Sequence, residues 1–336
     1  MRKTIGTLAV AAALLPVAAA LWAGASEIDD DLFATRRVFP NIGPGLRAVR
    51  RAANGNYYVL ASPSVGVTIF DPKGKQLSVV GASPDPAATK KMGLPSVAFG
   101  EDCDVDAHGN LFVADRGSNV VTVFSADGKQ LRSFPVDSLS SLAALPDGEV
   151  AVTTLQQSHL VTVYGPDGKV AREFGDPESL STRADLDHSL NLGRVSSDPQ
   201  GHLYYGFTYM PEPLVRQYDR YGNASMDFEF TGLDAFPEAQ ATRRAIEREE
   251  SRNTPPILRP ILTAFGVDPV NGDVWMGLHN TLVHFDKDGI RRSEYQIYTP
   301  KGARLDATVI LVEEEHLLIG ADPLGVYEFQ RPDRKH

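Results

Sequence analysis

The sequence predicts an all-β fold, a six-bladed β-propeller of four-stranded antiparallel blades, on the strength of two observations. First, glycines recur in pairs separated by 19, 19, 20, 21 and 17 residues, at Gly55 and Gly74, Gly109 and Gly128, Gly148 and Gly168, Gly201 and Gly222, and Gly272 and Gly289. Second, each pair marks the same text: an apolar run, a glycine turn, an apolar run, a polar loop, an apolar run, an Asp-x-Gly turn and a fourth run. This pattern is typical of a four-stranded antiparallel meander.

The repeats follow one another along nearly the whole chain. They cover about 46–80, 98–135, 139–175, 192–230 and 261–298, and a degenerate sixth copy covers about 306–332. Runs such as "VVTVF" and "LFVA" are apolar on both faces, which indicates blades that stack face to face around an axis.

The sixth copy departs from the pattern in two ways. Glu315 and His316 replace its first glycine turn, and it has three apolar runs with no fourth run after them. The stretch 33–40, "FATRRVFP", is similar to the outer-strand text "KQLRSFP" of the second repeat. We therefore expect residues 33–40 to supply the missing strand of the last blade, so that the ring closes without an open sheet edge.

The text "DVDAHGNLFVADRGSNVVTVFSADGKQLRSF" of the second repeat resembles an NHL repeat. The chain after residue 32 resembles the bacterial six-bladed NHL-type propellers, most strongly in the second repeat and least in the fourth and sixth. The resemblance implies the fold. Because that superfamily includes binding modules, lactonases and lyases, it does not imply one function.

The first 25 residues are predicted to be a secretory signal peptide. Arg2 and Lys3 form a basic start, Ile5–Leu21 is apolar, and Ala23-Gly24-Ala25 resembles a cleavage site. Cleavage after Ala25 leaves one domain, residues 26–336, which we expect in the periplasm or outside the cell. The alternative is an uncleaved membrane anchor, since the apolar stretch approaches the length of the shortest spanning helices. No other segment could span a bilayer.

The charge and the cysteine content narrow the range of partners. Removing the signal peptide takes away two positive charges and no negative ones, so the formal net charge goes from −10 to −12. So acidic a surface lacks the clustered cations that neutralise phosphates, which excludes nucleic acid as a partner.

Cys103 is the only cysteine, and we expect it to be a small buried hydrophobe. We expect a monomer.

Three connections between repeats are longer than the others. The first-turn glycines of the first five repeats lie 54, 39, 53 and 71 residues apart, so extra sequence follows the first, third and fourth repeats. These connections and the loops between second and third strands emerge on one face of a propeller, which we call the loop face. We expect it to be the working surface, because loops on a rigid scaffold commonly carry function.

The largest insertion is predicted to contain one short helix near 236–251 that lies over the loop face. Asp234 can cap it, Pro237 can begin it, and Pro255-Pro256 follow its end. Its apolar stripe is narrow, so we expect it to be packing decoration and not a moving lid.

The motif "DCDVD" places Asp102, Asp104 and Asp106 on one face of an inner strand, where the carboxylates would repel one another unless compensated. An EF-hand-type calcium loop is excluded, because Ala107 and Val113 stand where it needs glycine and glutamate. Asp106 is expected to belong to its turn.

Two arginines occupy positions on other inner strands that match these aspartates. Arg50 is equivalent to Asp104 on the neighbouring strand, and Arg194 is equivalent to Asp102 on a more distant one. We expect a structural ion pair between Arg50 and Asp104. A ligand site is the alternative.

Loops on the loop face carry polar and aromatic side chains that could bind a ligand around the tunnel mouth. They are Arg116 and Asn119 in "ADRGSN", Tyr209 and Glu212 in "TYMPEPL", His279 and Asn280 in "LHN", and Asp322 in "ADPLG". No pair among the eight histidines has tight metal-ligand spacing, and the Gly-x-Ser-x-Gly, His-Glu-x-x-His and phosphate-loop patterns are absent. The sequence therefore predicts no catalytic residue and no metal site.

The sequence favours an exported binding or interaction scaffold that acts through the loop face on a protein or a small molecule. The candidate ligand-binding residues are Arg50, Asp102, Asp104, Arg116, Arg194, Tyr209 and His279. The alternative is a metal-assisted lyase or lactonase in the central tunnel, with a divalent cation held by Asp102, Asp104 and His279. No cofactor is evident.

Overall fold

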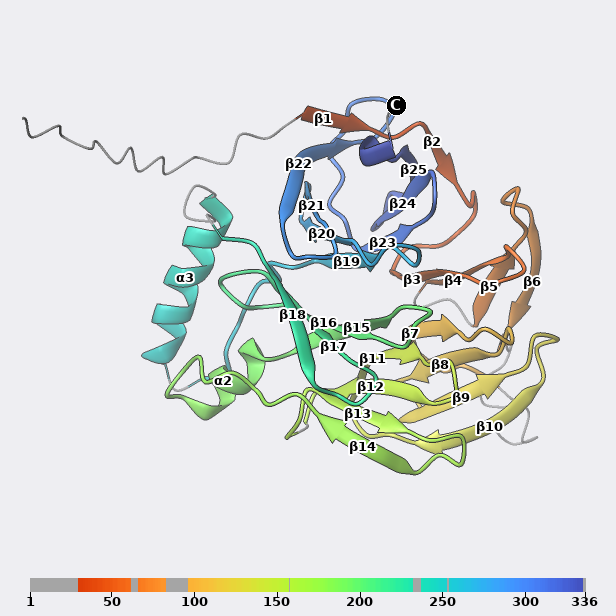
Figure 1. The fold of residues 1–336 in the computed structure, drawn as a ribbon, viewed down its shortest axis with the longest axis horizontal. Helices are drawn as coiled ribbons and strands as arrows, with labels where there is room; N and C mark the ends of the chain where they lie inside the picture. The colour runs from red at the N-terminus through yellow and green to blue at the C-terminus, as the bar shows by residue number, and fades with distance from the viewer. Residues whose placement is uncertain are drawn as a thin grey trace, which may run out of the picture.

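The computed structural model describes residues 30–61, 66–82, 96–156, 158–231, 237–252 and 254–334. Within these residues, six sheets surround a central axis (Figure 1), and each contains an antiparallel blade, which confirms the predicted six-bladed propeller. The predicted signal peptide, most of the first insertion and the proposed helix cap Asp234 lie outside the described residues.

The blades follow the order of the repeats, and the first strand of each repeat lies innermost. Blades one and two contain β3 (Leu46–Arg51), β4 (Tyr57–Ala61), β5 (Val67–Phe70), β6 (Gln76–Val80), β7 (Gly100–Val105), β8 (Leu111–Asp115), β9 (Val120–Phe124) and β10 (Gln130–Pro135). Blades three and four contain β11 (Leu139–Ala144), β12 (Val150–Thr154), β13 (Val161–Tyr164), β14 (Val170–Phe174), β15 (Gly193–Ser197), β16 (Leu203–Phe207), β17 (Leu214–Tyr218) and β18 (Ala224–Glu229). Blades five and six contain β19 (Ala264–Val267), β20 (Val274–Leu278), β21 (Thr281–Phe285), β22 (Arg291–Tyr298), β23 (Val309–Val312), β24 (His316–Ala321) and β25 (Gly325–Gln330).

In the part of the chain that the structure describes, the hydrophobic core consists of six clusters, and each cluster joins two neighbouring blades. Between blades one and two, for example, Leu60 and Ile69 pack with Val113 and Phe124. Cys103 is part of the same cluster and is fully buried, as predicted. Because the second strand of a blade is covered on both faces, its residues are apolar without alternation.

The first turn of blade two shows why Asp and Gly recur in the repeats. The Asp106 carboxylate accepts hydrogen bonds from the amide N–H groups of His108 (2.9 Å) and Asn110 (2.8 Å), and Gly109 adopts a φ of 81°. A short acceptor side chain and a residue free to adopt positive φ are what this turn requires. Asp106 therefore belongs to its turn, as predicted.

The ring closes through the N-terminal segment, as the sequence predicts, although the closing strand is shorter than 33–40. Strand β2 (Arg36–Val38) pairs antiparallel with β25, with Val38 opposite Val326. The Arg36 guanidinium binds the Glu328 carboxylate across this pair at 2.6 and 2.9 Å. The fourth strand of blade six thus comes from a segment almost 300 residues away in the chain.

Residues 30–33 form a further strand that the sequence analysis did not predict. Strand β1 (Asp30–Phe33) lies parallel to β22, so blade five has a fifth, outermost strand. Phe33 stacks on Tyr298 with 5.2 Å between ring centroids. The N-terminal segment therefore crosses from blade five to blade six and fastens both.

The described residues of the insertions contain two α-helices where one was predicted. Helix α3 (Pro237–Glu250) matches the predicted helix, whereas α2 (Ala184–Leu190), with Leu186 and Leu190 buried, was not predicted because it is too short for a clear period. The expected position of the long helix was also wrong, since Figure 1 shows α3 at the outer edge of the molecule. Neither helix is long and apolar enough to cross a membrane.

Side chains of the neighbouring loops hold α3 in place. Arg183 donates to the carbonyl oxygens of Glu249 and Arg252 at the C-terminal end of the helix, and Arg243 pairs with Glu212 in the β16–β17 loop. These contacts agree with a packing role for α3.

Candidate functional site

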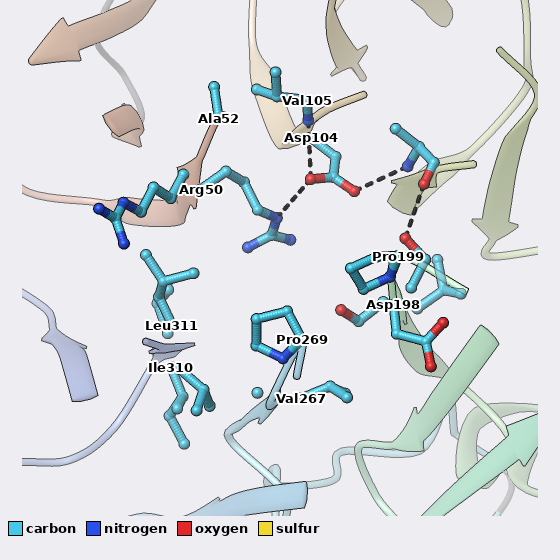
Figure 2. A pocket seen from close by; sticks show the side chains of 18 of the residues that line it. Arg50, Ala52, Asp104, Val105, Asp198, Pro199, Val267, Pro269, Ile310 and Leu311 are labelled. Carbon is cyan, nitrogen blue, oxygen red and sulfur yellow. Dashed lines mark hydrogen bonds and ion pairs between the residues drawn. The ribbon is translucent and has the colours of Figure 1, made fainter. Parts of the chain in front are cut away.

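The inner strands β3, β7, β11, β15, β19 and β23 contact one another in chain order around a central tunnel. Arg50 on β3 reaches across to β7 (Figure 2), where its guanidinium lies 3.2 Å from an Asp102 oxygen and 3.3 Å from an Asp104 oxygen. The predicted ion pair between Arg50 and Asp104 is therefore confirmed. The predicted equivalence of Asp102 and Arg194 did not produce a pair, because Asp102 turns to Arg50 and to blade three.

Both aspartates also bind the inner strand of blade three. Asp102 accepts a hydrogen bond from the Ser141 hydroxyl at 2.6 Å, and Asp104 accepts one from the Ala144 N–H at 2.9 Å. The network continues to blade four, where the Ser197 hydroxyl donates to the Ala144 carbonyl at 2.8 Å. A buried carboxylate is tolerated only when it is paired and hydrogen-bonded, so these contacts explain how acidic residues can line the inside of the ring.

The environment changes the acidity of two of these groups. Burial raises the pKa of the Asp104 carboxyl above its usual range, although Arg50 and the amide N–H groups of Ala144 and Val105 act in the opposite direction. Burial alone would lower the pKa of Arg50, but the carboxylates of Asp102 and Asp104 outweigh it and raise that pKa. Arg50 therefore stays charged while Asp104 resists ionisation.

The raised pKa of Asp104 makes stability depend on pH in a defined direction. The native state keeps the Asp104 proton to a higher pH than the unfolded chain, in which the pKa of an aspartate is about 3.9. The stabilising contribution of this group is therefore present at low pH and is lost as the pH rises from about 4 through the raised pKa. We expect Asp104→Asn, which cannot ionise, to gain stability relative to the wild type as the pH rises from about 4 to 7.

Urea unfolding of both proteins across that pH range measures the effect. Asp147→Asn, which removes an exposed carboxylate, is the matched control and should show a much smaller trend. A constant stability difference between Asp104→Asn and the wild type would contradict the assignment.

One cavity opens from the tunnel on the side of the first turns, opposite the loop face, and we call it the first-turn cavity (Figure 2). It has a volume of about 680 Å³. Arg50, Asp102 and Asp104 lie along its polar wall. Apolar residues from several blades also line it, among them Leu145, Pro146, Pro199, Val267, Pro269 and Leu311, together with further charged residues such as Arg51, Asp198, Glu313 and Glu314.

A second cavity of about 630 Å³ opens on the loop face, and we call it the loop-face cavity. Arg47 and Arg116 line it and share the carboxylate of Glu101, at 3.5 and 3.7 Å. Asp322 also lines it and accepts a hydrogen bond from the Gly45 N–H at 2.7 Å. The sequence analysis missed Arg47 and Glu101, although they lie on the same inner strands as Arg50 and Asp102.

Arg47, Arg194 and Thr308 line both cavities, and we call the zone they form the waist of the tunnel. The three residues come from the inner regions of blades one, four and six. Within the part of the chain that the structure describes, no hydrogen bond or ion pair engages the Arg194 side chain.

Six of the seven predicted site residues line one cavity or both. Arg116, Arg194 and Tyr209 line the loop-face cavity. The first-turn cavity is lined by Arg50, Asp102, Asp104 and again Arg194. His279 lines neither, because its ring lies 3.0 Å from the Pro260 carbonyl oxygen, so the structure does not bring it to Asp102 and Asp104.

Among the described residues, one group of His, Cys, Asp and Glu side chains is close enough to hold a metal ion, and it lies outside both cavities. It consists of Asp273, His284 and Asp333. The Asp273 carboxylate already accepts hydrogen bonds from Asn271 and Lys287, and Arg331 binds both oxygens of Asp333. These carboxylates are committed to the fold.

No protein-family model and no curated protein matches this chain. Solved structures do match its fold. A streptogramin B lyase is 13% identical with a TM-score of 0.54, covering 88% of this chain and 86% of that one. A gluconolactonase from Xanthomonas campestris is 17% identical with a TM-score of 0.54, covering 88% and 89%. The WD40 repeats of RRP9 are 11% identical with a TM-score of 0.55, covering 90% and 99%. At such identities the similarity establishes the propeller fold alone.

Proposed function

We propose that this protein is an exported propeller that binds a small molecule in the loop-face cavity. The observation that carries the proposal is the lining of that cavity, where Arg47, Arg116 and Arg194 converge with Tyr209 around about 630 Å³. This volume falls within the roughly 300–1,000 Å³ of small-molecule sites. A concave site with convergent guanidinium groups favours a small ligand over a flat protein surface.

Binding has more support than a metal-assisted lyase or lactonase reaction in the tunnel. That reaction would need Asp102 and Asp104 as metal ligands, but Arg50, Ser141 and the Ala144 N–H already engage their oxygens. The third proposed ligand, His279, binds the Pro260 carbonyl instead. A cation would have to displace contacts that join neighbouring blades.

The proposal also includes export and NHL-type repeats. Export is supported by the basic, apolar and small-residue segments before Ser26. The repeat type is supported by the sequence of blade two, which resembles an NHL repeat. N-terminal sequencing of the protein from periplasmic and culture fractions should find Ser26 first. Recovery of the chain with Met1 intact in the membrane fraction would contradict cleavage and favour the uncleaved membrane anchor.

Thermal unfolding with a panel of sugar acids, amino acids, short peptides and aromatic acids tests binding at the loop face. A ligand at about 100 times its Kd adds roughly 2.7 kcal/mol to the free energy of unfolding, which raises the midpoint visibly. We expect Arg116→Ala and Tyr209→Ala to reduce the rise. Arg220→Ala, which removes an exposed arginine outside both cavities, should leave it unchanged. A rise that neither loop-face variant reduces would contradict the proposed site.

A further inference from the structure

We propose that the waist of the tunnel binds a carboxylate, and that the apolar part of the same small molecule occupies the first-turn cavity. This site faces the opposite side of the propeller from the loop-face cavity. The site shares Arg47 and Arg194 with the loop-face cavity, but it goes beyond the proposed function because the body of the ligand lies on the opposite side of the ring.

Arg194 is the residue that makes the waist a candidate anion site. Its side chain is partly buried on β15 and reaches both cavities. No hydrogen bond or ion pair joins it to any other side chain or carbonyl that the structure describes. A guanidinium carries five donors and is charged at every physiological pH. Removal from water without a partner is costly, so Arg194 is well suited to gain energy from a bound anion.

Arg47 supplies a second cation with an unused donor. It is held to Glu101 by a single 3.5 Å contact of its Nη1 atom, and its Nε is buried with no hydrogen-bond partner. Because the inner strands follow one another around the ring in chain order, β3 of blade one and β15 of blade four stand on opposite sides of the tunnel. Arg47 and Arg194 therefore approach the waist from opposite walls.

The local charges favour a single negative charge on the ligand. Arg47 and Arg116 share one carboxylate, that of Glu101, while Arg50 faces the two carboxylates of Asp102 and Asp104. When both aspartates are ionised, the three arginines and three carboxylates of these two groups balance, whereas Arg194 has no ion-pair partner among the described residues. A monoanion matches it, and a planar carboxylate fits the fork of a guanidinium with two parallel hydrogen bonds.

The first-turn cavity provides an apolar surface next to the waist. Figure 2 shows Pro199, Pro269 and Val267 around this cavity, with Leu311 on another wall. The rigid rings of prolines and the aliphatic side chains offer a preformed surface for an aromatic or aliphatic group. With about 680 Å³ available, a molecule the size of a phenylalkanoic acid can be accommodated.

Besides Asp102 and Asp104, four acidic residues line the first-turn cavity: Asp106, Asp198, Glu313 and Glu314. Glu313 accepts a hydrogen bond from the Tyr57 hydroxyl at 2.8 Å and pairs with Arg51 at 3.1 Å, and Glu314 is exposed. Asp106 and Asp198 at the rim each accept two backbone N–H hydrogen bonds from their turns. On the loop side, Arg47 and Arg116 flank the single Glu101 carboxylate at 3.5 and 3.7 Å, so the acidic groups do not decide which cavity holds the ligand body. The apolar residues of the first-turn cavity are the reason for placing it there.

Calorimetry and thermal unfolding with three matched probes test the inference on residues 26–336. The probes are 4-phenylbutyrate, its neutral amide and 4-phenylbutylamine, with phenylphosphonate as the dianionic comparison. We expect only the carboxylate to bind well. Arg194→Gln should weaken the affinity for 4-phenylbutyrate by about tenfold or more, because a charged hydrogen-bond donor is lost. Arg194→Lys should recover part of the affinity. Arg194→Gln should fold normally, since the side chain has no described partner to lose.

Further variants separate this site from the loop-face cavity. Ala107→Trp places a bulky ring at an exposed turn position that lines the first-turn cavity. It should therefore weaken the binding of 4-phenylbutyrate. Arg116→Ala and Tyr209→Ala should leave carboxylate binding at the waist unchanged. The same two variants should weaken the ligand of the loop-face cavity, as described under the proposed function. The inference is overturned if the amide binds as well as the carboxylate, or if Arg194→Gln binds normally. It is also overturned if only the loop-face variants weaken binding, or if 4-phenylbutyrate fails to bind.

Discussion

Replacing Arg331 with methionine is expected to lower the free energy of unfolding by about 3–5 kcal/mol, because it leaves a buried carboxylate without its cation. The Arg331 side chain is fully buried and donates to Asp268 at 2.6 Å and to the Glu313 carbonyl at 2.9 Å. It also binds both oxygens of Asp333. These contacts fasten the segment after the last strand to the first turn of blade five and to blade six.

Equilibrium urea unfolding measures this loss. Arg334→Met is the matched control, because Arg334 lies 3.7 Å from the same Asp268 oxygen but is 39% exposed, and we expect it to cost less than about 1 kcal/mol. Adding Asp268→Asn to the Arg331→Met variant should restore part of the stability by removing the unpaired charge. Equal losses in Arg331→Met and Arg334→Met would show that the buried pair does not stabilise the ring.

Phe39→Ala is expected to destabilise the protein by about 3–5 kcal/mol, the usual cost of emptying a buried phenylalanine site. Phe39 is 2% exposed and follows the closing strand β2. Its ring packs on Tyr57 and Phe70 of blade one, with centroid distances of 5.1 and 4.8 Å. The side chain thus connects the segment that completes blade six to the core of the first blade.

Phe33→Ala is the matched control for this change. Phe33 lies on the same N-terminal segment and stacks on Tyr298, but it is 51% exposed, so we expect a loss of about 1 kcal/mol. Phe39→Leu keeps most of the apolar volume, so its loss in the free energy of unfolding should lie between those of Phe39→Ala and Phe33→Ala. If Phe39→Ala and Phe33→Ala unfold at the same urea concentration, ring closure does not depend on the Phe39 contact.

The blade pattern was predictable because it depends on residues close together in the chain. Asp106 and Gly109 specify one turn through a side-chain acceptor and a positive φ, and the same spacing recurs around the ring. The closing strand was also found, because its text is similar to that of another outer strand. Strand β1 and helix α2 were missed, since four and seven residues carry too little periodicity.

The candidate site was less predictable, because it depends on which side chains meet across the ring. Comparing repeat positions correctly paired Arg50 with Asp104, which lie on adjacent inner strands. The same comparison failed for Arg194, whose strand is two blades away from that of Asp102, and it said nothing of Arg47 and Glu101. His279 carries suitable chemistry for the tunnel, but its ring turns to a backbone carbonyl.

By itself the sequence determined the number of blades, their order, the turns and the segment that closes the ring. Each of these follows from local spacing and from apolar runs whose burial is favourable wherever they pack. Only the tertiary structure decided that Arg331 and Asp268 share a buried pair, that two cavities meet at a waist, and that Arg194 has no described partner there. Such pairings depend on distances between strands far apart in the chain, and those distances are set only when the ring has closed.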